Sequence, residues 1–411
     1  MACQSLWHFT LVISILEAFT TSMLAEGSNN PPIMFNAVDR CWRGNPGWFE
    51  QRQQLAMCSL GFAGKMKNNV GENVTSYVVT DPTDDAIDPK PGTLRYGVTK
   101  LTGKIWITFN HDMHIKLVKP LLVGSFTAID GRGASVHIAR GGCFMLDRVT
   151  NVIIHGLRFH HCRAQASGKV MGPSSKMMRL GATDGDAIRV VASTKVWIDH
   201  NTLYKCMDGL IDVTLGSTGI TISNNWFRDH DKVMLLGHAD DFHDDKNMKV
   251  TVAFNHFGPN CNQRMPRVRW GYAHVVNNLY QGWALYAIGG SMNPSIKSEA
   301  NLFVAPESGN KERTGKYESR NRVRSRRLGR RATITSRLHA SDYHEDGKKS
   351  WNFHSVRDYF ENGACFKSSE GQARIKPNYT NDQIFPVADA RVVRSLTRSA
   401  GALRCRADSR C

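Results

Sequence analysis

Acidic residues and long apolar runs are both scarce in this 411-residue sequence. Asp and Glu number 36 against 53 Lys and Arg, so the formal net charge is +17. This excess favours an acidic partner, which could be nucleic acid, an anionic membrane surface or a polyanionic carbohydrate. Beyond the amino terminus no apolar run is long enough to cross a bilayer, so we expect no membrane-spanning segment in the mature chain. A zinc site is not predicted either, because His230 and His238 lack its spacing.

The amino terminus carries one apolar stretch over residues 11–16, followed by small residues up to Ala25. This pattern predicts a secretory signal peptide over residues 1–25, although no Lys or Arg precedes the stretch. A membrane anchor is the alternative, but the stretch is well short of a bilayer span. We therefore expect a secreted, extracellular protein, and Asn73 and Asn378 head possible N-glycosylation triplets.

Secretion would allow the ten cysteines to form disulfides. Removal of the signal peptide takes Cys3 with it. The cysteines that lie closest in sequence are Cys41 with Cys58, Cys143 with Cys162, and Cys405 with Cys411. On this pairing Cys206, Cys261 and Cys365 would remain free or pair otherwise.

A recurring pattern begins near residue 150: two aliphatic residues two positions apart, an Asn three positions later, and a bulky apolar residue two beyond it. It occurs as Val196, Ile198, Asn201, Leu203; as Ile220, Ile222, Asn225, Phe227; and as Val250, Val252, Asn255, Phe257, with weaker copies around Asn278 and Asn301. The interval of about 23 to 30 residues fits one solenoid coil per repeat. Period-two apolar residues favour strands, and a fixed Asn can bond the coils above and below. The sequence therefore predicts an all-β, right-handed parallel β-helix with an Asn ladder and long loops; a β-sandwich is the alternative.

Two segments fall outside the repeat. Residues 48–66 have helical spacing, with Trp48, Leu55 and Phe62 as apolar contacts, and could form a helix that caps the open end of the solenoid. Residues 310–350 are rich in Arg, Ser, Lys and Gly, which predicts a basic, mobile surface insertion within a single domain over 35–411. The insertion could bind nucleic acid or heparin-like polymers, but a solvated loop is the favoured interpretation, so a nucleic-acid partner is not expected.

Four aspartates occur in two short runs, 183–186 and 207–212. Alternate residues of a strand share a face, which would pair Asp184 with Asp186 and Asp208 with Asp212. Crowded carboxylates raise one another's pKa unless a cation neutralises them, and an all-oxygen cluster suits Ca²⁺. Each pair taken alone could be a turn or a solvated surface feature. Their joint occurrence predicts a calcium site.

An arginine cluster follows over residues 263–269. Arg264 and Arg269 are five positions apart, which would place them on opposite faces of a straight strand. Pro266 supplies a bend that could turn both toward one groove. A surface charge patch is the alternative interpretation of these arginines, and an exposed lysine is the alternative for Lys232.

Asp199 and His200 are adjacent and resemble a metal or acid–base pair. Neighbouring residues on a strand point to opposite faces, so the two side chains are not expected to act together. We interpret both as structural residues.

Five motifs together resemble plant pectate lyases of polysaccharide lyase family 1, the branch that includes pollen allergens. They occur in the family's order, over residues 184–188, 196–200, 208–212, 232–238 and 264–269, and residues 41–46 resemble the start of the mature domain. The resemblance covers roughly residues 35–305 and 351–411. The basic insertion is the main departure from the family pattern.

The resemblance implies a calcium-dependent enzyme that cleaves de-esterified homogalacturonan by β-elimination, and a monomer of the cell wall. Carried over residue by residue, it implies Asp186, Asp208 and Asp212 as ligands of the primary Ca²⁺, Asp184 as a ligand of further calcium, Arg264 as the base, and Lys232 and Arg269 as substrate-binding residues. The pKa of a free arginine lies above ~12. A crowded cationic site with bound Ca²⁺ could lower it, and the family works at alkaline pH, so we predict alkaline activity here.

Three other functions remain open on sequence grounds. A glycoside hydrolase on the same fold would use paired carboxylates as acid and base or nucleophile. A pectin lyase acting on methylated polymer would have no need of the calcium ligands. A non-catalytic pectin-binding protein of the cell wall would keep the groove without turnover, and the intact Arg264 and aspartates argue against it.

Overall fold

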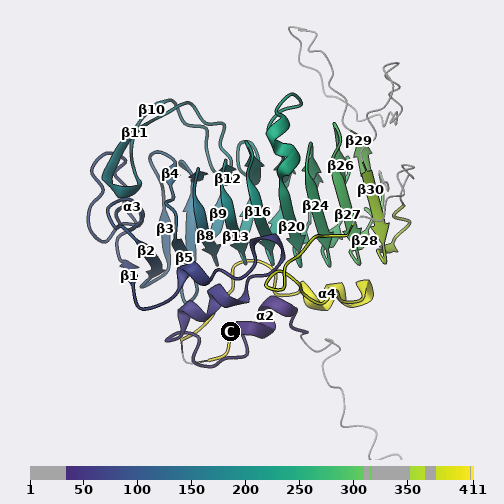
Figure 1. Cartoon of the computed structure of the whole chain (residues 1–411), viewed down its shortest axis with the longest axis horizontal. Coiled ribbons are helices and arrows are strands. Elements are labelled where there is room, and N and C mark those ends of the chain that lie inside the picture. The colour runs from purple at the N-terminus through teal and green to yellow at the C-terminus, as the bar shows by residue number, and fades with distance from the viewer. Residues whose placement is uncertain (1–33, 310–313, 317–351, 366–375, 408) are drawn as a thin grey trace, which may run out of the picture. The chain divides into compact units, whose positions relative to one another are not determined.

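The computed structural model describes residues 34–309, 314–316, 352–365, 376–407 and 409–411. Phe35–Cys411 forms one compact unit, and Met1–Met34 is a separate unit of which only Met34 is described (Figure 1). The signal peptide predicted over 1–25 lies outside the described residues. So does the basic insertion over 310–350, apart from one short strand, β29.

Three parallel sheets run side by side along the compact unit. The ten-stranded sheet consists of β1 (Val74–Val79), β2 (Lys104–Phe109), β5 (Thr127–Asp130), β8 (Thr150–His155), β13 (Thr194–Asp199), β16 (Thr218–Ser223), β20 (Lys249–Ala253), β24 (Tyr272–Val276), β27 (Ser295–Glu299) and β30 (Asn352–Val356). The nine-stranded sheet consists of β3 (Met113–Ile115), β6 (Val136–Ala139), β9 (Arg158–His160), β14 (Thr202–Tyr204), β17 (Trp226–Arg228), β21 (His256–Phe257), β25 (Leu279–Gln281), β28 (Leu302–Val304) and β31 (Tyr359–Glu361). The eight-stranded sheet consists of β4 (Leu121–Leu122), β7 (Phe144–Asp147), β12 (Ile188–Val191), β15 (Ile211–Thr214), β19 (Met234–Leu236), β23 (Arg267–Val268), β26 (Ile288–Gly290) and β29 (Thr314–Lys316).

The chain visits the three sheets in turn, so each coil adds one strand to each sheet. In one coil β12, β13 and β14 follow one another and lie in the eight-, ten- and nine-stranded sheets respectively. Equivalent positions of the sequence repeat pair with one another in neighbouring coils: Val196 pairs with Ile220, and Ile220 pairs with Val250. The predicted right-handed parallel β-helix is confirmed. One antiparallel hairpin, β10 (Gly168–Gly172) with β11 (Lys176–Leu180), joined by η4 (Pro173–Ser175), projects from it.

The repeated asparagines form the predicted ladder. Each Nδ2 donates to the Oδ1 of the next residue, over distances of 3.1, 3.1, 3.0 and 2.9 Å, in the order Asn201, Asn225, Asn255, Asn278, Asn301. The backbone N–H of Asn201 also donates to Asn225 Oδ1 at 2.9 Å, and the later steps repeat this bond. Both bonds satisfy groups that would otherwise be buried without a partner. The ladder ends on Asp358, whose Oδ1 accepts from Asn301 Nδ2 at 3.0 Å.

The bulky residue of each repeat fills the centre of the solenoid. Consecutive rings stack with centroids 5.0, 4.9, 4.4 and 5.6 Å apart, in the order Phe227, Phe257, Tyr280, Phe303, Phe360. These separations lie in the range of favourable aromatic pairs. The core is therefore continuous from coil to coil.

The amino-terminal end of the solenoid is covered by α3 (Leu94–Thr99), a helix that the sequence interpretation missed (Figure 1). Leu94 and Val98 lie one turn apart and enter the main core, and Thr93 Oγ1 accepts from Tyr96 N at the helix start. Residues 48–66, expected to form this cap, lie elsewhere. They form short 3₁₀ segments, η1 (Arg52–Cys58) and η2 (Gly61–Ala63). Trp48 and Leu55 pack on the outer face of the ten-stranded sheet, in one cluster with residues such as Trp106 and Trp197. The neighbouring η3 (Lys67–Asn69) and α2 (Ala37–Trp42) adjoin η1.

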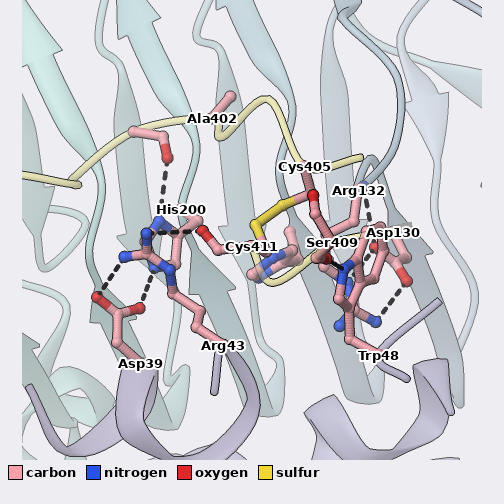
Figure 2. Close-up of a disulfide and its surroundings, with 12 residues drawn as sticks. Asp39, Arg43, Trp48, Asp130, Arg132, His200, Ala402, Cys405, Ser409 and Cys411 are labelled. Carbon is pink, nitrogen blue, oxygen red and sulfur yellow. Dashed lines mark hydrogen bonds and ion pairs between the residues drawn. A yellow bond between two sulfur atoms is a disulfide. The ribbon is translucent and has the colours of Figure 1, made fainter. Parts of the chain in front are cut away.

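The carboxyl-terminal residues return beside α2, after η6 (Ala390–Val392) and α4 (Val393–Leu396) (Figures 1 and 2). Arg43 Nη2 donates to the backbone oxygen of Cys411 at 2.9 Å, and Trp48 Nε1 donates to that of Ser409 at 2.9 Å. The Asp39 carboxylate binds Arg43 at 3.0 Å and His200 Nε2 at 2.7 Å. This buried network ties the two ends of the compact unit to the same flank of the sheet.

The three disulfides expected from sequence proximity are present: Cys41–Cys58, Cys143–Cys162 and Cys405–Cys411. Cys206, Cys261 and Cys365 are free thiols. Among the described residues, no helix is both long and apolar enough to span a membrane.

Asp199 and His200 are fully buried and bind different partners. Asp199 Oδ2 lies 2.9 Å from His155 Nδ1, whereas His200 binds Asp39 as described above. This arrangement agrees with the structural role expected for both residues.

Candidate active site

The four predicted aspartates, here called the acidic cluster, lie where two central strands of the eight-stranded sheet begin, β12 and β15. Asp184 and Asp186 stand in the turn before β12, and Asp208 stands in the turn before β15, within which Asp212 lies. The expectation that each pair belongs to one strand is therefore wrong for three of the four residues. The chain reverses before β12 at Gly185, whose positive φ of 103° favours glycine.

Gly209 explains how close the two runs come. Its backbone N–H donates to Asp186 Oδ1 at 2.7 Å. A Cβ at this position would lie 2.5 Å from Asp212 Oδ1 and 2.9 Å from Asp186 Oδ1, which is too close for any other residue without rearrangement. The Asp-Gly pairs thus form turns, as the alternative interpretation held, and these same turns bring the carboxylates together.

Asp184, Asp186 and Asp208 each offer a carboxylate oxygen within 4.8 Å of the others. Calcium binds oxygens at 2.3–2.6 Å, so two oxygens on one ion lie no more than about 5 Å apart. The spacing of these three residues therefore fits a calcium ion. Asp212 lies beside them, because Gly209 contacts both it and Asp186.

The electrostatics of the acidic cluster favour binding of a cation or a proton. Burial, followed by the charges of Asp184 and Asp208, raises the pKa of Asp186 to about 7. Burial and the charges of Asp186 and Asp208 also raise the pKa of Asp212 well above its ordinary value. Holding these groups ionised together costs free energy that a bound cation would recover.

Three basic residues surround the acidic cluster. Lys232, at the end of β18 (His230–Lys232), places Nζ 2.7 Å from Asp208 Oδ1. Arg189 pairs in register with Asp212 and places Nη1 3.8 Å from Asp184 Oδ1. The charge of Arg264 acts to lower the pKa of Asp212.

Arg189 was not identified from the sequence. It lies three residues after Asp186, on the outward face of β12, and the strand alternation alone would have placed it there. Its neighbour across the sheet depends on the register of the two coils, which no local motif encodes.

Arg264 lies between β22 (Cys261–Gln263) and β23, in a left-handed conformation with φ 63°. Its backbone oxygen accepts from Met234 N at 2.7 Å, which fixes the segment on β19. Its Nε is buried and has no hydrogen-bond partner among the described residues. An unpaired buried donor costs about 1–3 kcal/mol, so the position of Arg264 is maintained at a cost to the fold.

Arg269 was expected to share a groove with Arg264 through a bend at Pro266. Its Nε instead lies 3.1 Å from Asp240 Oδ1, and its Nη1 donates to Gly237 O at 2.8 Å. These bonds hold the guanidinium on the loop that leads to η5 (His243–Asn247).

A surface pocket of about 330 Å³ adjoins Asp208 and Lys232. Its lining includes Met207 and His230, and His230 Nε2 lies 2.6 Å from the backbone oxygen of Asp208. The pocket therefore opens directly beside the ion pair between Asp208 and Lys232.

Fold and site together define a class: a parallel β-helix that carries a cation-binding acidic cluster, flanked by lysine and arginine, on an outer sheet face. Such a surface suits an extended acidic polymer.

Comparisons with known proteins identify the family. The sequence model described as pectate lyase matches residues 51–336. Putative pectate lyase 2 of Arabidopsis thaliana is 44% identical over 403 residues, which are 97% of each chain. Pectate lyase 1 of Chamaecyparis obtusa is 45% identical over 372 residues, 90% of this chain and 92% of its own. The crystal structure of jun a 1, the major allergen from cedar pollen, superposes with a TM-score of 0.80 at 44% identity, over 90% of this chain and 99% of its own. The chain belongs to the pectate lyase family.

Proposed function

We propose that the protein is a calcium-dependent pectate lyase, which cleaves de-esterified homogalacturonan by β-elimination and releases unsaturated oligogalacturonides. Family membership supports the reaction. The observation that carries the proposal is the grouping of Asp184, Asp186 and Asp208 within 4.8 Å, with Lys232 at 2.7 Å from Asp208. An acidic sugar would meet both a cation and basic side chains there.

The proposed reaction removes the ring proton next to the carboxylate of a galacturonate unit. This proton is weakly acidic, because its loss adds negative charge to a group that already carries one. Arg264 is the proposed base, and Lys232 and Arg269 bind substrate carboxylates or hydroxyls. Once the proton has moved to unprotonated Arg264, the C–O bond to the neighbouring sugar breaks and a ring double bond forms. The departing sugar oxygen keeps the electron pair of the broken bond and takes a proton from water. Basic side chains aimed at the developing charge lower the barrier.

Following the family pattern, Asp186, Asp208 and Asp212 would hold the primary Ca²⁺. Asp184, whose carboxylate groups with those of Asp186 and Asp208, would serve the same ion or further calcium. When bound, Ca²⁺ would neutralise the substrate carboxylate and stabilise the charge that develops next to it. The raised pKa values of Asp186 and Asp212 support this assignment, since they report carboxylates that need a counter-charge.

The proposal also places the protein in the cell wall after secretion, with a signal peptide over residues 1–25. The mature protein would be a monomer with a single domain over 35–411. Asn73 and Asn378, both of which are exposed, would be glycosylated. The confirmed disulfides agree with an oxidising compartment.

Ultraviolet absorbance of the unsaturated product tests the function. Purified protein on polygalacturonate should give a rise that requires Ca²⁺ and stops on addition of chelator. Arg264→Ala should lower the rate by about 10²- to 10⁴-fold, the usual contribution of a general base. Arg179→Ala, at an exposed arginine of β11, is the matched control and should keep full activity.

The alternative outcome is also informative. Saturable binding of polygalacturonate without an absorbance rise would make the protein a non-catalytic pectin-binding protein of the cell wall. New reducing ends without an absorbance rise would point to hydrolysis instead.

A further inference from the structure

A second group of metal-ligating side chains lies on the nine-stranded sheet, away from the strands that carry the acidic cluster. His114, His137 and His160 project outward from β3, β6 and β9 and each offer a ring nitrogen within 4.8 Å of the others. They come from three successive coils, and His114 is in register with His137. We propose that these three histidines, here called the imidazole cluster, bind one transition-metal ion of the Zn²⁺ class.

The geometry between two of the rings is close to that of a metal site. His137 Nδ1 lies 2.9 Å from His160 Nε2. Zinc binds imidazole nitrogen at 2.0–2.1 Å, so two such ligands in a tetrahedral site lie about 3.3 Å apart. Without metal the two nitrogens share a proton, which requires at least one unprotonated ring. A metal ion would replace that proton after a small outward movement of the rings.

The other nitrogens of these two rings already have partners. His137 Nε2 lies 3.3 Å from Ser135 Oγ, and His160 Nδ1 lies 2.9 Å from His161 Nδ1. Metal-bound histidines commonly use their second nitrogen in this way, which fixes the ring orientation and directs the first nitrogen at the ion. Tyr204 also stacks on His160 with ring centroids 4.8 Å apart. The pair is therefore held in position by its surroundings.

His114 supplies the adjustable third ligand. Its ring stacks on His137 with centroids 4.1 Å apart and an interplanar angle of 19°, and its side chain is exposed. Rotation about its side-chain bonds can turn a nitrogen toward the other two without moving the backbone. A fourth ligand would be water, since these three histidines supply only three nitrogens.

The surroundings select the class of ion. Arg158 is in register with His137 on the neighbouring strand, and its charge opposes any cation there, so binding has to come from bonds between the ion and the ring nitrogens. Imidazole nitrogen suits Zn²⁺, Cu²⁺ and Ni²⁺, whereas Ca²⁺ takes oxygen ligands. The imidazole cluster and the acidic cluster should therefore bind different metals, and the inference does not depend on the proposed lyase activity.

Calorimetric titration of Zn²⁺ into full-length, tag-free, chelator-treated protein tests the proposal, with excess Ca²⁺ present to fill the acidic cluster. We expect one Zn²⁺ per chain and a higher Tm in its presence, because the ion would link three coils. His137→Gln and His114→Gln should each weaken binding at least tenfold. His256→Gln, at a histidine of the same sheet that pairs with Gln281, should bind as the parent protein does.

Absence of binding, or equal affinity in the parent protein and both cluster variants, would overturn the proposal. Equal loss in His256→Gln would overturn it as well. If His137→Gln fails to fold, the exposed His114→Gln still decides the outcome.

Discussion

Arg189 and Asp212 are direct neighbours across β12 and β15, and the same arginine reaches to 3.8 Å from Asp184. The acidic cluster therefore contains a cation of its own. A divalent ion that binds there must share the carboxylates with this guanidinium.

Replacement of Arg189 should tighten calcium binding. The ion pair with Asp184 is partly exposed, with side-chain exposures of 28% and 57%, so its net value is at most about 1 kcal/mol. We expect Arg189→Gln to bind Ca²⁺ about three to ten times more tightly in a calorimetric titration. Arg179→Gln, at an exposed position, should leave the affinity unchanged. Weaker binding in Arg189→Gln would show that the arginine supports the cation site instead of competing with it.

The sequence predicted those parts of the molecule that depend on local chemistry repeated along the chain. Asn201 to Asn301 recur at the coil interval, and an Asn that bonds the next coil is visible as a periodic residue. The aspartates were predicted because carboxylates close together in sequence indicate a cation site, whether they lie on strands or in turns. The close approach of the two turns at Gly209 could not be predicted from the sequence, since it depends on how neighbouring coils pack.

Other features were missed for physical reasons. The helix α3 is six residues long, too short to show a helical period, and it is stabilised by burial of Leu94 and Val98. The bond of Arg269 to Asp240 joins a strand end to a loop 29 residues away, and nothing in the local sequence indicates it. Arg189 was missed because its role follows from the register of neighbouring coils.

Lys232 should affect substrate binding more than calcium binding. Its side chain is 40% exposed beside the pocket, so it can contact both Asp208 and an incoming carboxylate. A hydrogen bond to a charged group contributes about 1.5–3 kcal/mol, so Lys232→Gln should raise KM for polygalacturonate about tenfold or more. Calcium affinity should not fall, since Asp208 loses a competing cation. Lys169→Gln, at an exposed lysine of β10, is the control; a parallel loss of calcium binding in Lys232→Gln would contradict the assignment.

The pH profile of the reaction tests Arg264 as the base. A base must be unprotonated to act, and free arginine has a pKa above ~12, compared with ~10.4 for lysine. The rate should therefore rise toward alkaline pH. Arg264→Lys should retain part of the activity with its rise displaced to lower pH, as measured by initial rates between about pH 6 and 11. Full activity in mildly acid buffer with loss at high pH would exclude this role.

The Asp130–Arg132 pair should control stability in acid. Burial alone would raise the pKa of Asp130, but Arg132 at 2.7 Å and Arg52 at 3.1 Å hold it well below its ordinary value. A depressed pKa stabilises the fold above the unfolded value near 4, and this stabilisation is lost as the pH falls below it. Asp130→Asn leaves Arg132 and Arg52 without this charged partner, so it should lower the free energy of unfolding by about 3–5 kcal/mol at pH 7. Urea unfolding at pH 7 and pH 3 should show a smaller difference between variant and parent at pH 3.

Asp358, at the end of the Asn ladder, should have the opposite pH dependence. Burial raises its pKa, although Ser298, Ser355 and Asn301 all donate to its carboxylate. A raised pKa means that the stability contributed by the protonated form is present below about pH 4 and is lost as the pH rises through the folded value. An amide at this position would avoid the buried charge, because its oxygen can accept from Asn301 and its nitrogen can donate to the serine hydroxyls, which can rotate.

Asp358→Asn should therefore raise the free energy of unfolding at pH 7, and the gain should shrink toward zero at pH 4. Asn255→Asp is the reciprocal change inside the ladder. It places a carboxylate between Asn225 and Asn278 and removes the donor to Ile222 O, so it should destabilise the protein at pH 7 more than at pH 4. Urea unfolding of both variants at the two pH values measures the effect. If Asp358→Asn lowers stability equally at pH 4 and pH 7, the carboxylate is required for its hydrogen bonds and its charge is not a cost to the fold.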